Sequence, residues 1–340
     1  FIVPDSREGW CELIRRVLSA YFSTGKSFSY STVCVRGYGE PIHGFGGVAS
    51  GPMPLINCVS KICKILDARK GKHIRPIDGA DILCCIGEMV VAGNVRRSAI
   101  LVQGDPFDRE FLQAKRWSLG TVPSHRAFAN FSVNCSDVED LHPMFWKTYE
   151  DGEAFGIVNV QNIQKYGRMG EEKKDKAIAT NPCGEATLED SESCNLVDIP
   201  LLNIKDEDEL EMVARVLLRH AKRVNAGVFH NPKSNAVISR NQRVGVGLTG
   251  VAGRPDLFNK DVLDRIYYAI QREDEGYSAY LGLPLSIRTT VIKPSGTLSK
   301  LLDQDGCEGI HAPYAKHIIQ RIRMSSDDEL VVLLKNAGHE

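Results

Sequence analysis

The chain has 340 residues, of which 43% are hydrophobic and 25% are charged, and its formal net charge is −1. These proportions are typical of globular proteins, the balanced charge gives no general attraction to nucleic acid or to a membrane surface, and no apolar run approaches the ~20 residues of a membrane span. Ten cysteines without secretory features indicate free thiols in a reducing compartment, so we expect a cytoplasmic protein.

The first hundred residues are predicted to combine helices with a long loop. Apolar residues at helical spacing and short apolar runs are the signals used. In chain order they predict a helix at 10–22, a strand near 32–35 inside a stretch rich in glycine, serine and proline, helices at 55–67 and from Asp78 or Asp81 to about Val91, and a strand at 98–102.

The second half of the chain is predicted to alternate strands with helices, which indicates an α/β fold with a largely parallel sheet. In chain order we expect a strand at 155–160, a charged, solvated loop at 169–178, a helix at 206–224, strands at 244–248 and 289–292, and a last helix from Ser325 or Ser326 to about Gly338. The helix at 206–224 has acidic residues first and basic residues last, including Lys222, which complements its dipole. We interpret it as a surface helix with a charged face.

The most informative motif is Asn181-Pro182-Cys183-Gly184-Glu185. Pro182 favours an extended conformation for Asn181, and in an extended segment alternate side chains point the same way. An amide, a thiol and a possible general base are therefore expected on one edge. A lone cysteine is more often a packed, inert side chain, but this five-residue string is followed by a second cysteine at position 194.

Together with Cys194, this string resembles the finger-loop signature of ribonucleotide reductases. The form with Pro182 and Gly184 is similar to the adenosylcobalamin-dependent class II enzymes. Further segments, in the same order along nearly the whole chain, resemble the monomeric ribonucleoside-triphosphate reductase branch. They are residues 3–10, 43–56, 90–99, 243–247, 293–297 and 319–323.

The resemblance implies part of a ten-stranded α/β barrel with a central finger loop that carries the radical cysteine. Residues 1–340 would be a partial catalytic barrel domain, with the effector and specificity-loop region at 1–102 and the finger loop and substrate-phosphate region at 155–340. Because the chain begins at Phe1 rather than Met, we interpret it as an internal fragment that lacks N-terminal and C-terminal parts.

The resemblance also implies roles for the motif residues in reducing ribonucleoside triphosphates to deoxyribonucleotides. A cofactor normally carries such a radical step, and here adenosylcobalamin would generate a thiyl radical on Cys183 that takes the 3′ hydrogen. Glu185 would be the base, Asn181 would hydrogen-bond the substrate, and Cys194 would be half of a reducing dithiol reloaded by thioredoxin or a similar reductant.

The other half of that dithiol is missing from the pattern. None of the early cysteines stands in a matching context, and no C-terminal cysteine pair is present. The early cysteines are Cys11, Cys34, Cys58 and Cys63. The partner is expected upstream of Phe1, and the isolated chain is expected not to turn over.

Residues 293–297, Lys-Pro-Ser-Gly-Thr, follow a predicted strand and would start a helix whose backbone N–H groups could face a phosphate. Taken alone, this is more often an ordinary helix cap. The resemblance implies a substrate-phosphate loop made of Pro294, Ser295, Gly296 and Thr297.

The segment at 93–98 pairs a flexible turn with two guanidinium groups, which suit phosphate and base recognition, although a solvated basic turn is the alternative. The resemblance implies the specificity loop of a site for a deoxynucleotide effector, with a companion loop between Gly37 and Gly51. The residues assigned to the two loops are Gly93, Asn94, Arg96, Arg97 and Ser98, and His43, Gly44, Gly46 and Gly47.

Other functions stay open from the sequence. A class I reductase with a separate radical-generating subunit is one, and a non-catalytic nucleotide-binding module is another. A thiol–disulfide protein is disfavoured because no CxxC is present. We expect no metal site, since Cys58 and Cys63 lack ligand spacing and no HExxH occurs.

Overall fold

The structure is a computed structural model. It describes residues 1–42, 47–91, 99–120, 122–151, 155–296, 298–302, 304–313, 315, 317 and 329–339. The chain forms two compact units, each described by itself: the first comprises Phe1–Ser132, Leu141–Phe155 and Gln320–Glu340, and the second Val133–Asp140 and Gly156–Ile319.

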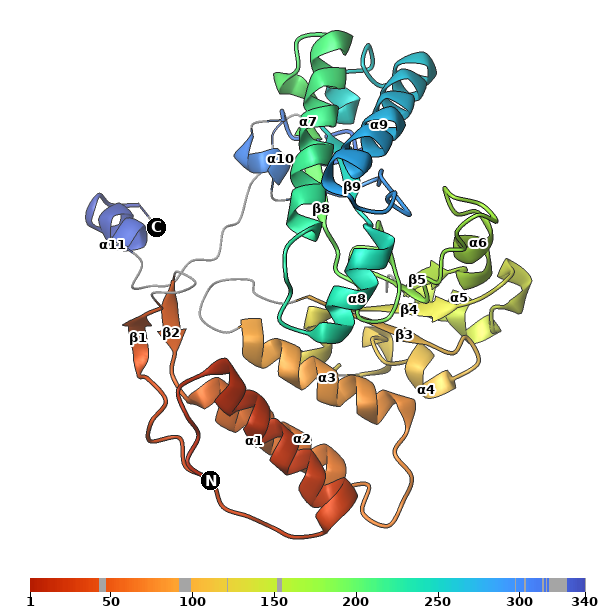
Figure 1. The fold of residues 1–340 in the computed structure, drawn as a ribbon. Coiled ribbons are helices and arrows are strands. Elements are labelled where there is room, and N and C mark those ends of the chain that lie inside the picture. The colour runs from red at the N-terminus through yellow and green to blue at the C-terminus, as the bar shows by residue number, and fades with distance from the viewer. Residues whose placement is uncertain are drawn as a thin grey trace. The chain divides into compact units, whose positions relative to one another are not determined.

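The first unit is built on three packed helices, α1 (Arg7–Ser19), α2 (Met53–Asp67) and α3 (Pro76–Val91) (Figure 1). The Ser6 side chain caps α1 by accepting a hydrogen bond from the backbone N–H of Gly9 at 3.0 Å. The apolar faces of the helices share one core. Its fully buried members include Leu13, Leu55 and Ile62.

Smaller elements complete this unit. Strands β1 (Tyr38–Pro41) and β2 (Val48–Ser50) pair antiparallel. Phe111, Phe131, Phe145 and Phe155 gather with ring centroids 5.3–6.4 Å apart. The remaining helices are α4 (Arg109–Leu112), α5 (Pro143–Glu150) and α11 (Glu329–Asn336). The chain also has a three-stranded sheet of the order β3-β4-β5, with bounds Ile100–Gly104, Ala129–Asn134 and Phe155–Val158, which is not confined to the residues of the first unit.

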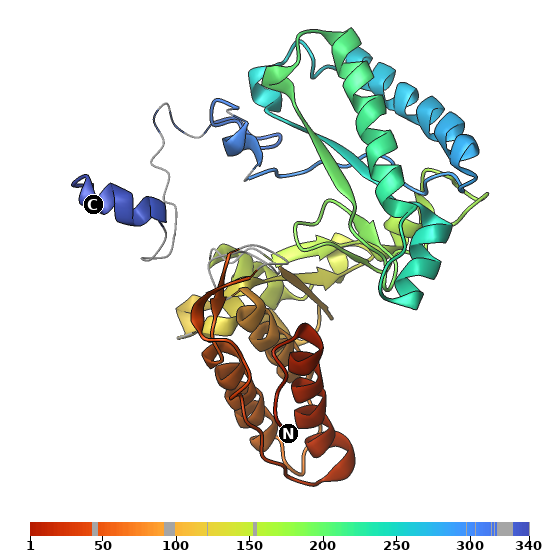
Figure 2. The same ribbon diagram turned by 60° about the vertical axis from the view of Figure 1, so that its left-hand side comes forward.

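The second unit is organised around the parallel pair β8 (Leu196–Pro200) and β9 (Gly245–Thr249), which pair in register from Leu196↔Gly245 to Pro200↔Thr249. An isolated parallel bridge between Val246 and Thr290 extends the pair. Two long helices, α7 (Glu207–Asn225) and α9 (Lys260–Leu281), lie side by side in Figures 1 and 2. Their apolar side chains form one core with those of β8 and β9.

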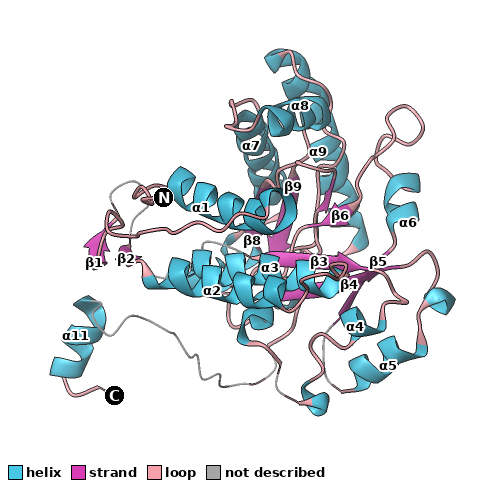
Figure 3. Cartoon of the chain, turned by 90° about the horizontal axis from the view of Figure 1, so that it is seen from below, coloured by secondary structure: helices cyan, strands magenta, loops and turns pink. Residues whose placement is uncertain are grey.

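The rest of the second unit consists of short strands and helices joined by loops. Figure 3 colours the strands, helices and loops of the chain separately. The two-residue strands β6 (Ala179–Thr180) and β7 (Thr187–Leu188) form an antiparallel hairpin. The helices are α6 (Val160–Lys165), α8 (Pro232–Asn241) and α10 (Leu298–Leu301).

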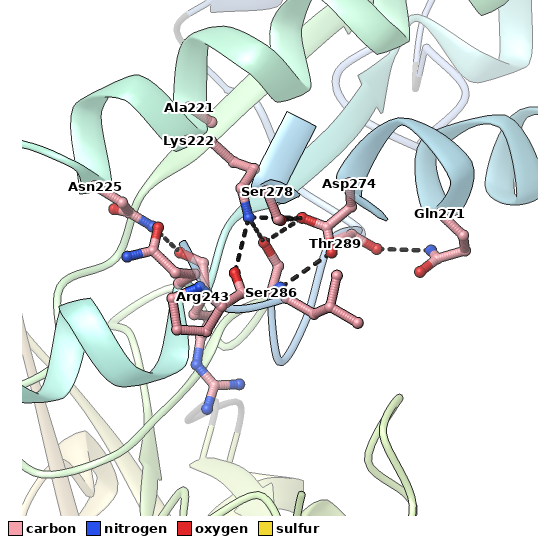
Figure 4. Close-up of polar contacts among 12 residues, drawn as sticks. Ala221, Lys222, Asn225, Arg243, Gln271, Asp274, Ser278, Ser286 and Thr289 are labelled. Carbon is pink, nitrogen blue, oxygen red and sulfur yellow. Dashed lines mark hydrogen bonds and ion pairs between the residues drawn. The ribbon is translucent and has the colours of Figure 1, made fainter. Parts of the chain in front are cut away.

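A buried polar cluster joins α7, α9 and the segment after α9 (Figure 4). The Lys222 ammonium donates to Asp274 Oδ1 at 2.8 Å and to Ser286 Oγ at 3.0 Å, and both charged side chains are 0% exposed. Lys222 is therefore a core residue and not part of a surface face, so that part of the sequence interpretation is wrong. A buried lysine is tolerated there because Asp274 supplies a compensating negative charge.

The helix predictions are confirmed within one or a few residues for α1, α2, α3 and α7, but two strand predictions are wrong. Residues 32–35 form a turn closed by a 2.9 Å hydrogen bond from Val35 N to Thr32 O, and 289–292 contribute only the bridge at Thr290. The segment at 169–178 is a loop as expected, although Asp175 in it is buried.

The α/β class is observed, whereas a largely parallel sheet is not. The β1–β2 and β6–β7 pairs are antiparallel, because each joins strands that are close in the sequence by a hairpin. The described strands form four separate small sheets and no closed sheet. The ten-stranded barrel remains an expectation. Among the described helices, none combines the length and the apolar character needed to cross a membrane.

Candidate active site

The motif of residues 181–185 forms the turn of the β6–β7 hairpin. The backbone N–H of Gly184 donates to Asn181 O at 2.9 Å, and Asn181 N donates to Ala186 O at 2.9 Å. Pro182 stands at the second turn position, which it suits, and Gly184 has a φ of 85°. The segment is therefore not extended, and the alternation predicted from the sequence is wrong. A Pro–x–Gly sequence between paired strands favours a turn over an extended strand.

The Asn181 side chain holds this turn together. Its Oδ1 accepts a hydrogen bond from the Ala186 N–H at 3.0 Å, and the residue is only 6% exposed. The same side chain hydrogen-bonds to the thiol of Cys194. The amide thus connects the turn to the second cysteine of the motif.

The turn still brings the four predicted site residues close together, although they do not alternate along an extended strand. Cys183 and Cys194 are exposed, and Glu185 is half-buried with its Oε2 buried and without a hydrogen-bond partner among the described residues. Although Cys194 is exposed as a residue, burial of its thiol raises the pKa to about 11. The Glu185 carboxylate and Cys183 act in the same direction, while the Asn181 hydrogen bond opposes them.

None of the ten cysteines, all of which lie in the described ranges, forms a disulfide. Cys194 is therefore a protonated thiol near neutral pH, next to an acidic side chain and a second thiol. Such a group is a poor thiolate nucleophile and keeps its S–H hydrogen near neutral pH.

Cys194 is positioned through its neighbour. Asn195 donates from Nδ2 to Ala221 O at 2.7 Å and to Asn225 Oδ1 at 2.9 Å. Asn225 in turn donates to Arg243 O at 2.9 Å (Figure 4). The end of α7 is thereby fastened to the start of β8. This chain of amides fixes the backbone that carries Cys194.

A network of buried charged side chains contacts the hairpin and the segments next to it. The Arg243 guanidinium contacts Asp175 at 2.7 and 3.0 Å, Thr187 Oγ1 at 2.8 Å and Glu192 at 3.0 Å, and its side chain is 3% exposed. Arg288 also contacts Asp175, at 3.1 Å. Burial works against the ionised form of Asp175, but the two arginines outweigh it and lower the pKa of that carboxyl.

Two cavities border the hairpin. One, of about 80 Å³, is lined by residues that include Glu185, Cys194, Arg243 and Arg288. The other, of about 670 Å³, reaches Gly184 and Glu185 and is lined mainly by apolar side chains of β9, α9 and the 290–292 segment. The turn therefore has a small space of mixed polar and apolar lining on one flank and a large apolar one beside it.

Asp198 is a site residue that the sequence reasoning missed. It lies on β8, its side chain is 0% exposed, and its Oδ2 accepts a hydrogen bond from the Ser295 hydroxyl. Burial raises the pKa of Asp198 to about 6, with Lys293 acting to lower it and Glu185 to raise it. The signal was available, because a carboxylate is unusual among the apolar residues of a short strand such as 196–200.

The predicted phosphate segment adopts a compact shape. Ser295 is 4% exposed with a φ of 51°, and its carbonyl accepts from Ser299 N at 3.1 Å and Ser299 Oγ at 2.7 Å. Pro294 and Gly296 flank it, while Thr297 lies outside the described residues. The helix that follows, α10, has only four residues and so adds little dipole. The group most open to an anion is the Lys293 ammonium, on a side chain that is 26% exposed.

Most residues of the predicted effector loops lie outside the described residues. Gly47 is described, with a φ of 77° and a carbonyl that accepts a hydrogen bond from Ile42 N at 2.9 Å. The residues that are not described are His43, Gly44, Gly46, Gly93, Asn94, Arg96, Arg97 and Ser98. Within the described ranges, no group of three or more histidine, cysteine or acidic side chains could hold a metal ion.

Comparison with known proteins gives two family matches in this chain. Residues 133–256, which hold the hairpin, Cys194 and Asp198, match the family described as ribonucleotide reductase, barrel domain. Residues 1–66 match the insertion domain of B12-dependent ribonucleotide reductase. The chain belongs to the B12-dependent, class II ribonucleotide reductases.

Individual relatives have the same character. The adenosylcobalamin-dependent ribonucleoside-triphosphate reductases of Lactobacillus acidophilus and Lactobacillus leichmannii are each 34% identical over 99% of this chain and 50% of their own length. A crystal structure of a B12-dependent (class II) ribonucleotide reductase superposes with a TM-score of 0.83 at 31% identity, covering 99% of this chain and 52% of that one. The chain spans about half the length of the curated relatives it matches.

Proposed function

We propose that this chain carries the reactive centre of an adenosylcobalamin-dependent reductase that converts ribonucleoside triphosphates to 2′-deoxyribonucleoside triphosphates. The observation that carries the proposal is the meeting of Asn181, Cys183, Glu185 and Cys194 in one site of the second unit. The names of the relatives, which are adenosylcobalamin-dependent ribonucleoside-triphosphate reductases, supply the substrate and cofactor class.

Cys183 is suited to be the thiol that becomes a radical. Its place at the exposed tip of a tight turn lets a bulky cofactor approach the sulfur, and the apolar cavity beside Gly184 could shield a reactive centre from water. Residues around that turn therefore fit the cofactor. When bound, adenosylcobalamin would supply the radical chemistry that amino-acid side chains lack.

Glu185 and Cys194 are suited to the proton and electron steps. The buried Glu185 Oε2 is an acceptor with no hydrogen-bond partner among the described residues, so it can take the proton of the substrate 3′-hydroxyl. The 2′-hydroxyl needs a proton to leave as water, and a thiol with a pKa of about 11 keeps its proton near neutral pH. Cys194 can provide that hydrogen and, together with a second thiol, two electrons, which the two thiols release to the substrate as they are oxidised to a disulfide.

The surroundings of this centre have proposed roles as well. Lys293 and the segment Pro294–Thr297 would bind the substrate phosphates, and Asn181 would contact the substrate through its amide nitrogen while its oxygen holds the turn. Residues 1–102 would hold the deoxynucleotide effector through the two glycine-containing loops. Thioredoxin or a similar dithiol would restore Cys194.

The decisive experiment replaces Cys183 with serine in the intact gene product. We expect formation of deoxynucleotide to stop while nucleotide binding persists, because the side chain is exposed and serine has nearly the same size and shape. Cys135→Ser, a change at a half-buried cysteine outside the site, is the matched control and should keep activity. Product formed at a substantial rate by Cys183→Ser would remove the proposal.

Dependence on the cofactor separates class II from class I chemistry. We expect no turnover without added adenosylcobalamin. Turnover that instead required a separate radical-generating subunit would favour the class I alternative.

A further inference from the structure

Asp198 is a buried carboxylate that the proposed reaction does not use. Its Oδ2 accepts the Ser295 hydroxyl and lies 4.0 Å from Lys293 Nζ. Its Oδ1 is buried and has no hydrogen-bond partner among the described residues. A buried carboxylate oxygen without a donor is costly, so its retention at the centre of a site calls for a functional explanation.

The backbone reserves space for Asp198 and Lys293. Asp198 pairs with Gly247 across the β8–β9 ladder. A β-carbon at position 247 would lie 3.2 Å from Asp198 Oδ1 and 3.3 Å from Lys293 Cβ. Glycine at this position thus allows the carboxylate and the lysine stem to meet above the strand.

The three side chains differ in access to solvent. Asp198 and Ser295 are fully or almost fully buried, whereas Lys293 is 26% exposed. An incoming anion can therefore reach the ammonium but not the hydroxyl. At 4.0 Å the ammonium is close enough to Asp198 to be attracted and too far for a direct hydrogen bond.

We propose that Asp198 is a positioning residue that retains Lys293 in the anion-free site and yields it to the phosphates of the substrate. The proposal rests on the proposed function, because it takes the segment around Ser295 as the substrate-phosphate site. In this arrangement the carboxylate keeps the Ser295 turn fixed and competes with the phosphate for one ammonium.

Charge at Asp198 then sets the affinity of the segment for anions. The charged groups that face it are Lys293 and Glu185, and burial raises the pKa of Asp198 to about 6. Above that pH the ionised carboxylate holds the ammonium, and below it the protonated carboxyl releases it. Anion affinity is therefore expected to rise as the pH falls through about 6.

The test uses equilibrium dialysis of the chain with labelled inorganic sulfate, an anion whose charge stays constant over this pH range. Asp198→Asn keeps an acceptor for the Ser295 hydroxyl and removes the charge. We expect it to bind sulfate roughly threefold or more tightly at neutral pH, the size expected for losing a weak ion-pair partner. We also expect it to lose the rise in affinity at low pH.

The matched control is Glu308→Gln, which removes a carboxylate that pairs with Lys300 at 2.9 Å and lies near Gly296. It should keep the pH dependence of the parent. In the intact protein, Asp198→Asn should lower KM for the triphosphate and also lower kcat. The phosphates would bind more tightly, but Lys293 would no longer be held in the position that orients the substrate. A purely structural role would not produce that split.

A third variant separates this inference from the proposed function. Lys293→Gln should abolish the sulfate site; if it does not, both the phosphate segment and the role of Asp198 are wrong. If Lys293→Gln abolishes binding but Asp198→Asn changes neither affinity nor its pH dependence, only the role of Asp198 is overturned. The pH series on the parent chain decides the matter even where Asp198→Asn does not fold, since a flat profile across pH 6 contradicts the inference.

Discussion

Replacing Asp274 with asparagine should be among the most damaging single changes in the second unit. Asp274 is 0% exposed and accepts hydrogen bonds from Lys222 Nζ at 2.8 Å and from Ser286 Oγ and N at 2.7 and 3.0 Å (Figure 4). It also accepts a hydrogen bond from Arg168 Nη1 at 2.7 Å. Asparagine keeps one acceptor oxygen and turns an NH₂ towards one of the two cations. A buried cation then loses its acceptor, which costs about 3–5 kcal/mol of the free energy of unfolding.

The partner change should be milder and coupled to the first. Lys222→Met preserves most of the aliphatic volume and leaves Asp274 with Arg168 and Ser286, so we expect a loss of about 1.5–3 kcal/mol, as for a hydrogen bond to a charged group. The double variant should be no less stable than Asp274→Asn alone. Once the ammonium is gone, the asparagine amide no longer faces a cation at that position.

Urea unfolding followed by two probes measures the effect. The chain has three tryptophans, Trp10, Trp117 and Trp146, and all lie in the first unit, so their fluorescence reports that unit. Far-UV circular dichroism also reports α7 and α9. Asp274→Asn should shift the circular dichroism transition and leave the fluorescence transition in place.

The control on the same helix is Lys260→Met, which breaks an exposed ion pair with Asp264 and should change stability little. If Asp274→Asn cost no more than this control, the reasoning from burial would be refuted. A pH series gives a second check. Burial disfavours the ionised Asp274, but Lys222, Ser286 and Arg168 outweigh it and lower its pKa. Its contribution is therefore present above the unfolded value of about 3.9 and lost below it, so parent and variant should converge in acid.

Three further outcomes follow from the site. Glu185→Gln removes the carboxylate that raises the pKa of Cys194, so alkylation of Cys194 at mildly alkaline pH, followed by mass spectrometry, should be faster than in the parent; an unchanged rate would contradict the coupling. Asn195→Ala breaks two hydrogen bonds to α7 and should cost about 1–3 kcal/mol in urea unfolding; no loss would mean that the strand start is held by other contacts. Gly309→Ala places a β-carbon 2.5 Å from the Lys293 carbonyl at a φ of 57°, so sulfate binding should weaken, and retained affinity would show that the segment tolerates the shift.

The sequence was a good guide to the helices because their signals are local. Asp206 caps α7 by accepting a hydrogen bond from the Glu209 N–H at 3.0 Å, and the apolar stripe that follows faces the core, so both the cap and the buried face are visible in the sequence. Lys222 was misjudged for a non-local reason. Its counterion Asp274 is on another helix, and helical charge order cannot show that pairing.

The candidate site was predictable in membership more than in shape. The spacing and chemistry of Cys183, Glu185 and Cys194 indicated a shared site, and the structure places them within electrostatic reach of one another. The predicted extended geometry is wrong because Pro182 restricts only Asn181, whereas Gly184 and the two flanking strands together favour a turn. Asp198 was missed because its meaning depends on Ser295, 97 positions away.

The hairpin also explains how an exposed thiol can be held accurately. If Cys183 meets a bulky cofactor, as proposed, it has to stay exposed, so the contacts that fix it must come from the buried side of the turn. Here the Asn181 amide closes the turn. The buried Arg243 forms ion pairs with Asp175, which precedes the hairpin, and with Glu192, which follows it. Breaking a buried ion pair of this kind costs several kcal/mol, which is more than an exposed turn could supply from its own hydrogen bonds. We therefore expect the position of the turn to depend on the buried ion pairs of Arg243 with Asp175 and Glu192. Substitutions that break these pairs should alter turnover although they change neither thiol.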